Sequence, residues 1–66
     1  MRFFQVEAAE GAEVFLIATT DTASEAVIKL TDALDRHARA WATDETGTDV
    51  SMEDLIARAR QERGTS

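Results

Sequence analysis

Cysteine is absent from this chain of 66 residues, and histidine occurs only once. The first absence excludes disulfide bonds and thiolate metal sites, and a single histidine removes the usual zinc sites. Long hydrophobic runs are also missing: the longest spans five residues, far short of a signal-peptide core or a membrane span. We therefore expect a soluble protein of the reducing cytoplasm, with no membrane contact.

The small size of the chain limits what can stabilise it. Residues 1–66 are expected to form a single domain, and a domain of this length buries only about 60% of its unfolded surface. Natural chains this short often add disulfides, a metal or a partner. Because disulfides and the usual zinc sites are excluded, association with a second copy or with another protein is the remaining source of stability.

The most informative segment is the apolar run Val14–Ala18. Successive side chains of a strand point to opposite faces, so a strand with this composition needs cover on both faces. The run falls within a predicted strand of about residues 13–19, and the alternation before it predicts another over about residues 2–8. Helices of the same chain, or one helix and a partner, must supply the cover.

A tight turn at residues 10–11 is expected to join the two strands into a hairpin, because glycine accepts positive φ at low cost. This turn predicts that Val6 lies opposite Phe15 and Phe4 opposite Ile17, all on one face. The main apolar residues of the other face are then Phe3, Val14 and Leu16.

Two helices are predicted after the hairpin. Residues 22–25, Thr-Ala-Ser-Glu, match a capping box. Apolar spacings of three and four then continue to Trp41, which predicts a helix over residues 23–41. Ser51 is a second cap, before a helix of about residues 52–63. The predicted fold is α+β: an antiparallel β-hairpin, a long amphipathic helix and a shorter C-terminal helix (ββαα).

The hairpin is expected to need a partner copy. The long helix covers only one of its faces, and an isolated hairpin is marginally stable with unpaired edges. We therefore expect a homodimer whose interface is the Phe3, Val14 and Leu16 face or a strand edge. The competing arrangement places the second helix on that face within one monomer. Ile28 lies among charged residues, away from the apolar stripe, and is either a lone exposed residue or a further contact.

Negative charge is concentrated in one segment of a chain whose formal charge is −6. Residues 42–54 hold five acids and no base: Asp44, Glu45, Asp49, Glu53 and Asp54. Such a block repels phosphate backbones, so we expect no direct nucleic-acid binding and favour a basic protein partner contacted by these five residues. A solvated loop without a binding role is the alternative.

No constellation of residues predicts catalysis, so we expect neither an enzyme nor a catalytic, cofactor or metal site. His37 lies at the margin of the helical stripe and has no obvious nucleophile beside it. The acids of residues 44–49 do not follow the spacing of a calcium loop. The three glycines are scattered and form no phosphate-binding loop.

The remaining functions are those of a small acidic, non-enzymatic protein-binding module. The specific expectation is an inhibitor that presents carboxylates to a basic, nucleic-acid-binding surface of its partner. In size and charge the chain resembles phage-encoded anti-defence inhibitors, including anti-CRISPR proteins, and this resemblance implies an inhibitory role in a phage or mobile element. The alternative is an antitoxin-like or accessory subunit that associates through its hairpin.

Overall fold

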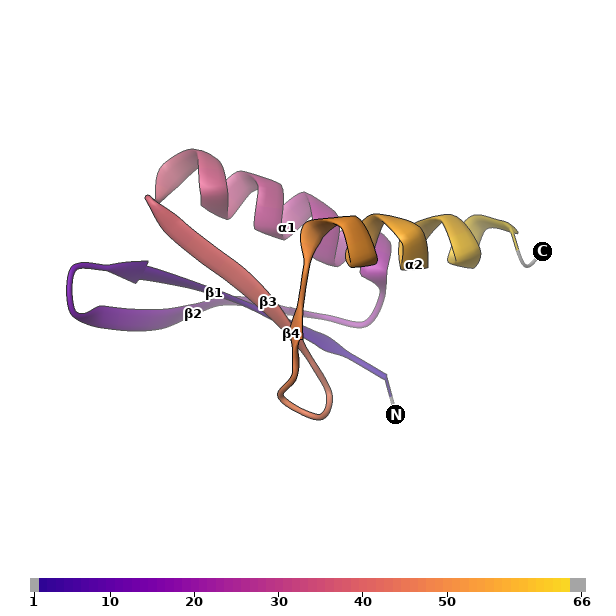
Figure 1. Ribbon diagram of the computed structural model, residues 1–66, viewed down its shortest axis with the longest axis horizontal. Coiled ribbons are helices and arrows are strands. Elements are labelled where there is room, and N and C mark those ends of the chain that lie inside the picture. The colour runs from indigo at the N-terminus through magenta and orange to yellow at the C-terminus, as the bar shows by residue number, and fades with distance from the viewer. Residues whose placement is uncertain (1, 65–66) are drawn as a thin grey trace.

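The computed structural model describes residues 2–64 as an α+β arrangement, in which two helices lie on one side of a four-stranded antiparallel sheet (Figure 1). The elements are, in chain order, β1 (Phe4–Glu10), β2 (Glu13–Thr20), α1 (Ala23–Arg36), β3 (Arg39–Asp44), β4 (Asp49–Val50) and α2 (Met52–Gly64). In space the strands follow the order β2-β1-β3-β4, so β1 is paired along both edges. The α+β class is confirmed, but the order is ββαββα and not ββαα.

The first hairpin turns one residue later than its sequence predicts. Glu10 pairs with Glu13, which leaves residues 11–12 as the two-residue loop in place of residues 10–11. Gly11 has φ of 60°, the positive value that the first central residue of a type II′ turn needs. The first strand accordingly spans Phe4–Glu10 and not residues 2–8.

The register of the hairpin also differs from the predicted one. Val6 faces Ala18 and not Phe15, which pairs with Ala8 instead. The register shifts between Val6 and Glu7, where Ile17 is the extra residue of a β-bulge in β2. A displacement of two residues keeps a side chain on its own face, so Phe15 still faces the helices, and Ile17 packs against the core.

Helix α1 begins where its capping box predicts and ends earlier than its apolar stripe predicts. The hydroxyl of Thr22 accepts a hydrogen bond of 3.2 Å from the backbone N–H of Glu25. The helix stops at Arg36, and His37 is extended, with φ of −129°. The prediction of a helix over residues 23–41 is therefore wrong at its C-terminal end.

The segment after α1 becomes a strand because β1 has a second edge to satisfy. β3 pairs with β1 from Phe4 opposite Asp44 to Ala9 opposite Arg39. Backbone groups in the middle of a sheet require such partners, and a helix extended to Trp41 would leave this edge of β1 open. Ala40 and Ala42 also alternate with the larger side chains of Arg39, Trp41 and Thr43, which suits a strand whose two faces differ, so pairing with β1 prevails over the helical spacing.

Helix α2 confirms the predicted second helix almost residue for residue. The hydroxyl of Ser51 accepts a hydrogen bond of 3.1 Å from the backbone N–H of Asp54. The guanidinium of Arg58 lies 5.8 Å from the centre of the Phe4 ring. In Figure 1, α2 lies beside α1 and runs in the opposite direction. The second helix is thus on the same side of the sheet as α1, so its alternative placement on the Phe3, Val14 and Leu16 face is wrong.

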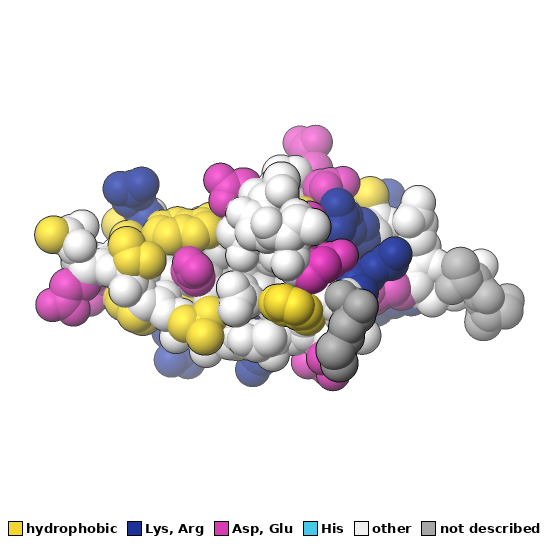
Figure 2. Space-filling model, turned by 90° about the horizontal axis from the view of Figure 1, so that it is seen from below, with side chains coloured by type: hydrophobic (Ala, Val, Ile, Leu, Met, Phe, Trp, Pro, Cys, Tyr) yellow, Lys and Arg dark blue, Asp and Glu magenta, His cyan; other side chains and the backbone are white. Residues whose placement is uncertain are grey.

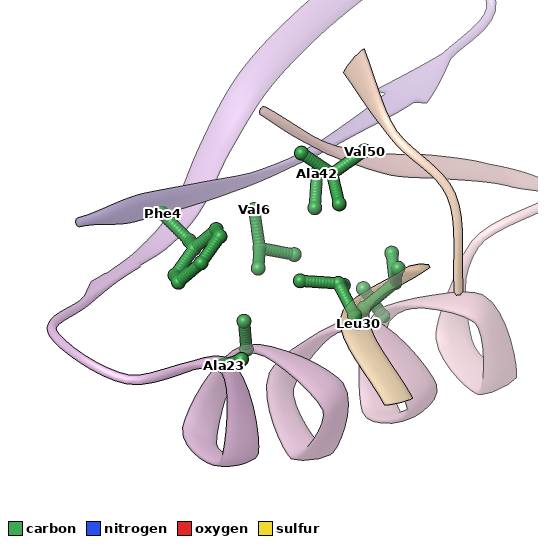
Figure 3. Packing of buried hydrophobic residues seen from close by; sticks show 9 residues of the cluster. Phe4, Val6, Ala23, Leu30, Ala42 and Val50 are labelled. Atoms are coloured by element: carbon green, nitrogen blue, oxygen red, sulfur yellow. The ribbon is translucent and has the colours of Figure 1, made fainter. Parts of the chain in front are cut away.

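The core lies between the sheet and the helices (Figure 3). It contains few large side chains: Phe4, Val6 and Leu55 are the largest that are fully buried. The other members of the cluster are Ala23, Ala26, Leu30, Ala33, Ala42 and Val50. Small residues on α1 and β3 let the helix lie close to the sheet, so the core is thin, and each large side chain contributes a large share of the buried volume.

Candidate protein-binding surfaces

Within residues 2–64, no helix covers the second face of the sheet, and we call it the open face. Because paired residues of antiparallel strands share a face, the register places three rows of side chains on it. The rows are Thr19–Gln5–Thr43–Asp49, Leu16–Glu7–Trp41 and Val14–Ala9–Arg39. Figure 2 views the molecule from this side and shows apolar side chains interspersed with acidic ones. Val14 and Leu16, on the edge strand β2, are 60% and 54% exposed, so two large apolar side chains lie close together on this face.

The centre of the open face holds a carboxylate between two apolar neighbours. Glu7 pairs with Leu16 on one side and Trp41 on the other, and it is half-buried by them. Within residues 2–64, no hydrogen bond or ion pair engages this carboxylate. A partly desolvated charge without a counter-charge is unfavourable, so the site suits a cation supplied by another molecule.

The predicted acidic surface is divided by the structure, beginning with Asp44 at the end of β3. Its Oδ1 atom accepts hydrogen bonds from the N–H of Thr46 at 2.9 Å, the hydroxyl of Thr46 at 2.6 Å and the N–H of Thr48 at 3.1 Å. The hydrogen bond from the Thr46 hydroxyl is the main cause that holds the pKa of Asp44 below its ordinary value. Asp44 therefore organises the β3–β4 loop and is only partly available to a partner.

Asp54 has a local role as well, while the other three acids do not. Its carboxylate lies 3.3 Å from the guanidinium of Arg58, one turn later on α2. Glu45, Asp49 and Glu53 are exposed, and no hydrogen bond or ion pair engages their carboxylates within residues 2–64. Asp49 pairs with Thr43 at the edge of the open face, so part of the acidic segment adjoins that face.

A second apolar surface lies on the helical side of the molecule. It is a groove along α1 and α2, and we define the helical groove by Val27, Ile28, Leu34 and Ile56. The last three of these are 64%, 46% and 38% exposed. Of these residues, Ile28 alone is a candidate contact from the sequence.

The predicted interface residues therefore do not form one surface. Val14 and Leu16 lie on the open face, as expected, and Phe3 precedes β1 and is half-buried. Ile28 belongs to the helical groove. Trp41, which the sequence places at the end of a helix, is instead a central residue of the open face. The alternation of residues 38–42 was the signal that could have located it.

His37 takes part in packing at the end of α1. Its ring makes an edge-to-face contact with Phe15 at 5.1 Å, and its Nδ1 atom lies 3.2 Å from the Glu10 carboxylate. These contacts hold the end of α1 against the hairpin, so His37 has a role in packing.

Glu62 caps the other end of α1 from a distant part of the chain. Its carboxylate accepts hydrogen bonds from the N–H of Ala23 at 2.7 Å, the N–H of Ser24 at 3.2 Å and the hydroxyl of Ser24 at 3.1 Å. Partial burial raises the pKa of Glu62, but these hydrogen bonds together outweigh it, and the pKa lies below its ordinary value. An anion at a helix N-terminus is also favoured by the helix dipole, so Glu62 fixes α2 against α1.

Three comparisons with known proteins were made for this chain. No protein-family model, curated protein or solved structure matches the chain. In the part of the chain that the structure describes, no three acidic or histidine side chains are grouped as metal ligands. No helix of residues 2–64 is long and apolar enough to cross a membrane.

Proposed function

We propose that this protein is a non-enzymatic binding module that docks onto a partner protein through its open face. The observation that carries the proposal is the uncovered centre of that face, where Leu16 and Trp41 flank the unpaired carboxylate of Glu7. An apolar patch that contains tryptophan and has a polar rim is typical of protein interfaces. Tryptophan is also among the residues that most often dominate binding energy.

The total surface of the chain supports this proposal. A monomer of this mass typically exposes roughly 4,100 Å², whereas this chain exposes 4598 Å². The open face contributes to this surface, because neither α1 nor α2 covers it. A partner on the open face would bury Val14 and Leu16, which are more than half exposed in the free chain.

The charge of the chain favours a partner that is basic as well as apolar. The net charge is −6, and the acidic segment meets the open face at Asp49. An arginine of the partner could pair with Glu7 while its guanidinium stacks on Trp41, because arginine combines both interactions. Asp49 would then contact a basic residue at the rim.

The specific function that we propose is inhibition of a nucleic-acid-binding partner. A negatively charged module seated on a basic surface excludes phosphate backbones from it, because the carboxylates occupy the place of the phosphates and repel those that approach. This is how phage anti-defence proteins, including anti-CRISPR proteins, would be expected to use a chain of this size and charge.

A second candidate function rests on the free edge of β2. This strand has eight residues and, among the described residues 2–64, pairs only with β1, so its outer edge offers backbone groups to another strand. An antitoxin-like or accessory subunit could associate by adding this edge to the sheet of its partner. Backbone pairing would depend little on Glu7, which separates the two candidates.

Capture of partners from the native host tests the proposal when variants are compared quantitatively. We expect Leu16→Asp to abolish capture of the partner and Glu7→Lys to weaken it strongly, whereas Lys29→Glu on α1 leaves it unchanged. Charge reversal at Glu45 and Asp49 should reduce capture less, because these residues lie at the rim.

The purified partner then decides between the functions. Inhibition predicts that the wild-type chain displaces nucleic acid from the partner and that Leu16→Asp does not. Capture that survives both Leu16→Asp and Glu7→Lys would contradict docking through the open face. Loss of capture with Leu16→Asp alone, with Glu7→Lys unaffected, would favour strand addition.

A further inference from the structure

The helical groove has opposite charges at its two ends. Arg60 lies beside the start of α1, next to Ser24 and Ile28, and Asp35 lies near the end of α1. Within residues 2–64, neither charge takes part in an ion pair or hydrogen bond. The pairing of Asp35 with residue 39 that a longer helix would allow is lost, because residue 39 belongs to β3. The groove thus has an apolar centre with a cation at one end and an anion at the other. When a second copy is rotated by 180° onto it, the cation of each copy faces the anion of the other.

The spacing of residues along α1 fixes where the axis of such a half-turn would pass. Residues on one helical face recur at three and four positions, and Ile28 and Leu34 stand three positions before and after Thr31. A twofold axis through Thr31 therefore places Ile28 of one copy against Leu34 of the other. It also brings Asp35 of the second copy to the level of Val27.

Arg60 lies at the same level on α2. Glu62 is fixed beside Ala23 and Ser24 by its hydrogen bonds. Because the helices run in opposite directions, Arg60 is about level with residues 25–26, which lie roughly 1.5–3 Å along the axis from Val27. This axial offset is shorter than an arginine side chain, so an ion pair with Asp35 of the second copy needs no shift along the helix axis.

We propose that the helical groove is the interface of a homodimer, in which two copies pack α1 against α1 in antiparallel orientation about Thr31. Ile28 packs on Leu34 of the second copy, Ile56 borders this contact, and Arg60 pairs with Asp35 of the second copy. Two ion pairs form, one at each end, as an isologous interface requires.

The open face is a poorer surface for self-association. A twofold axis through its centre brings two copies of Glu7 together, and like charges at a buried contact disfavour binding. The helical groove is small, so the dimer belongs to the class of weak, reversible interfaces, with a dissociation constant in the micromolar range. Use of the groove by two copies leaves both open faces available to other proteins.

Sedimentation equilibrium of the full chain tests the dimer directly. Between about 10 µM and 1 mM, the apparent mass should rise from 7.2 kDa towards twice that value. Ile28→Asp should raise the dissociation constant at least about 100-fold. Ile28 is 64% exposed, so the variant should remain folded, as circular dichroism would verify. Leu16→Asp is the matched control on the open face and should leave self-association unchanged.

Two charge-reversal variants give a further test, because a variant that is merely unfolded would not regain association when mixed with the other. Asp35→Arg and Arg60→Glu each place two like-charge contacts in their own homodimer, so each variant alone should be monomeric. In an equimolar mixture the contacts become opposite in sign, and a heterodimer should form. The proposal is overturned if the mixture stays monomeric, if the wild type is monomeric at 1 mM, or if Leu16→Asp disrupts the dimer while Ile28→Asp does not.

Discussion

The substitution Leu55→Ala tests how much the packing of α2 on the sheet stabilises the fold. The Leu55 side chain is 0% exposed and lies in the same cluster as Phe4 and Val50. Leucine-to-alanine changes at buried sites cost about 2–5 kcal/mol, because apolar contacts are lost and a cavity remains. A domain of 66 residues has a total stability of about 3–10 kcal/mol. Leu55→Ala should therefore remove a large part of the free energy of unfolding.

The adjacent residue supplies the control. Ile56 directly follows Leu55 in α2 and is 38% exposed. Ile56→Ala should therefore lower the free energy of unfolding by less than about 1 kcal/mol. Urea unfolding followed by Trp41 fluorescence measures both variants, at a concentration of about 5 µM to keep the chain monomeric. In a separate thermal melt, the melting temperature of Leu55→Ala should fall by about 12–24 °C for a loss of 3 kcal/mol. A loss no greater than that of Ile56→Ala would refute the packing of α2 on the sheet.

Two further changes test local features. Glu62→Gln should lower the unfolding free energy at neutral pH. The carboxylate contributes its full stabilisation above its ordinary pKa of 4.5 and loses it as the pH falls through its lower pKa in the folded protein. The difference in unfolding free energy between the variant and the wild type should therefore shrink in acid. A difference that does not depend on pH would contradict the capping role of Glu62. Gly47→Ala should cost about 1–2 kcal/mol in thermal melts, because Gly47 has φ of 84°, and an unchanged melting temperature would contradict this backbone geometry.

Local signals in the sequence predicted the parts of the fold that local interactions determine. Thr22 and Ser51 mark the two helix starts because their hydroxyls accept hydrogen bonds from amides within three residues. The end of α1 depends instead on β1, which lies far away in the sequence. Residues 37–42 fit both a helical and an alternating pattern, and only the unpaired edge of β1 decides between them.

The candidate surfaces were predictable to a similar extent. The alternation along β2 placed Val14 and Leu16 on the face away from the helices, where the structure also has them; that they need cover stays a prediction. Trp41 could not be placed beside them while its segment was assigned to a helix. The availability of individual acids was equally hidden, because the role of Asp44 depends on a loop geometry that brings Thr46 and Thr48 to its carboxylate.

Hydroxyl-radical footprinting of the complex recovered from the native host tests the docking surface most directly. Oxidation of Trp41 and Leu16 would be compared between the free chain and the chain bound to its partner. The account predicts that both residues are protected several-fold in the complex, with Val14 following them. Unchanged oxidation of Trp41 and Leu16 in a verified complex would contradict the central claim that the open face is where this protein binds.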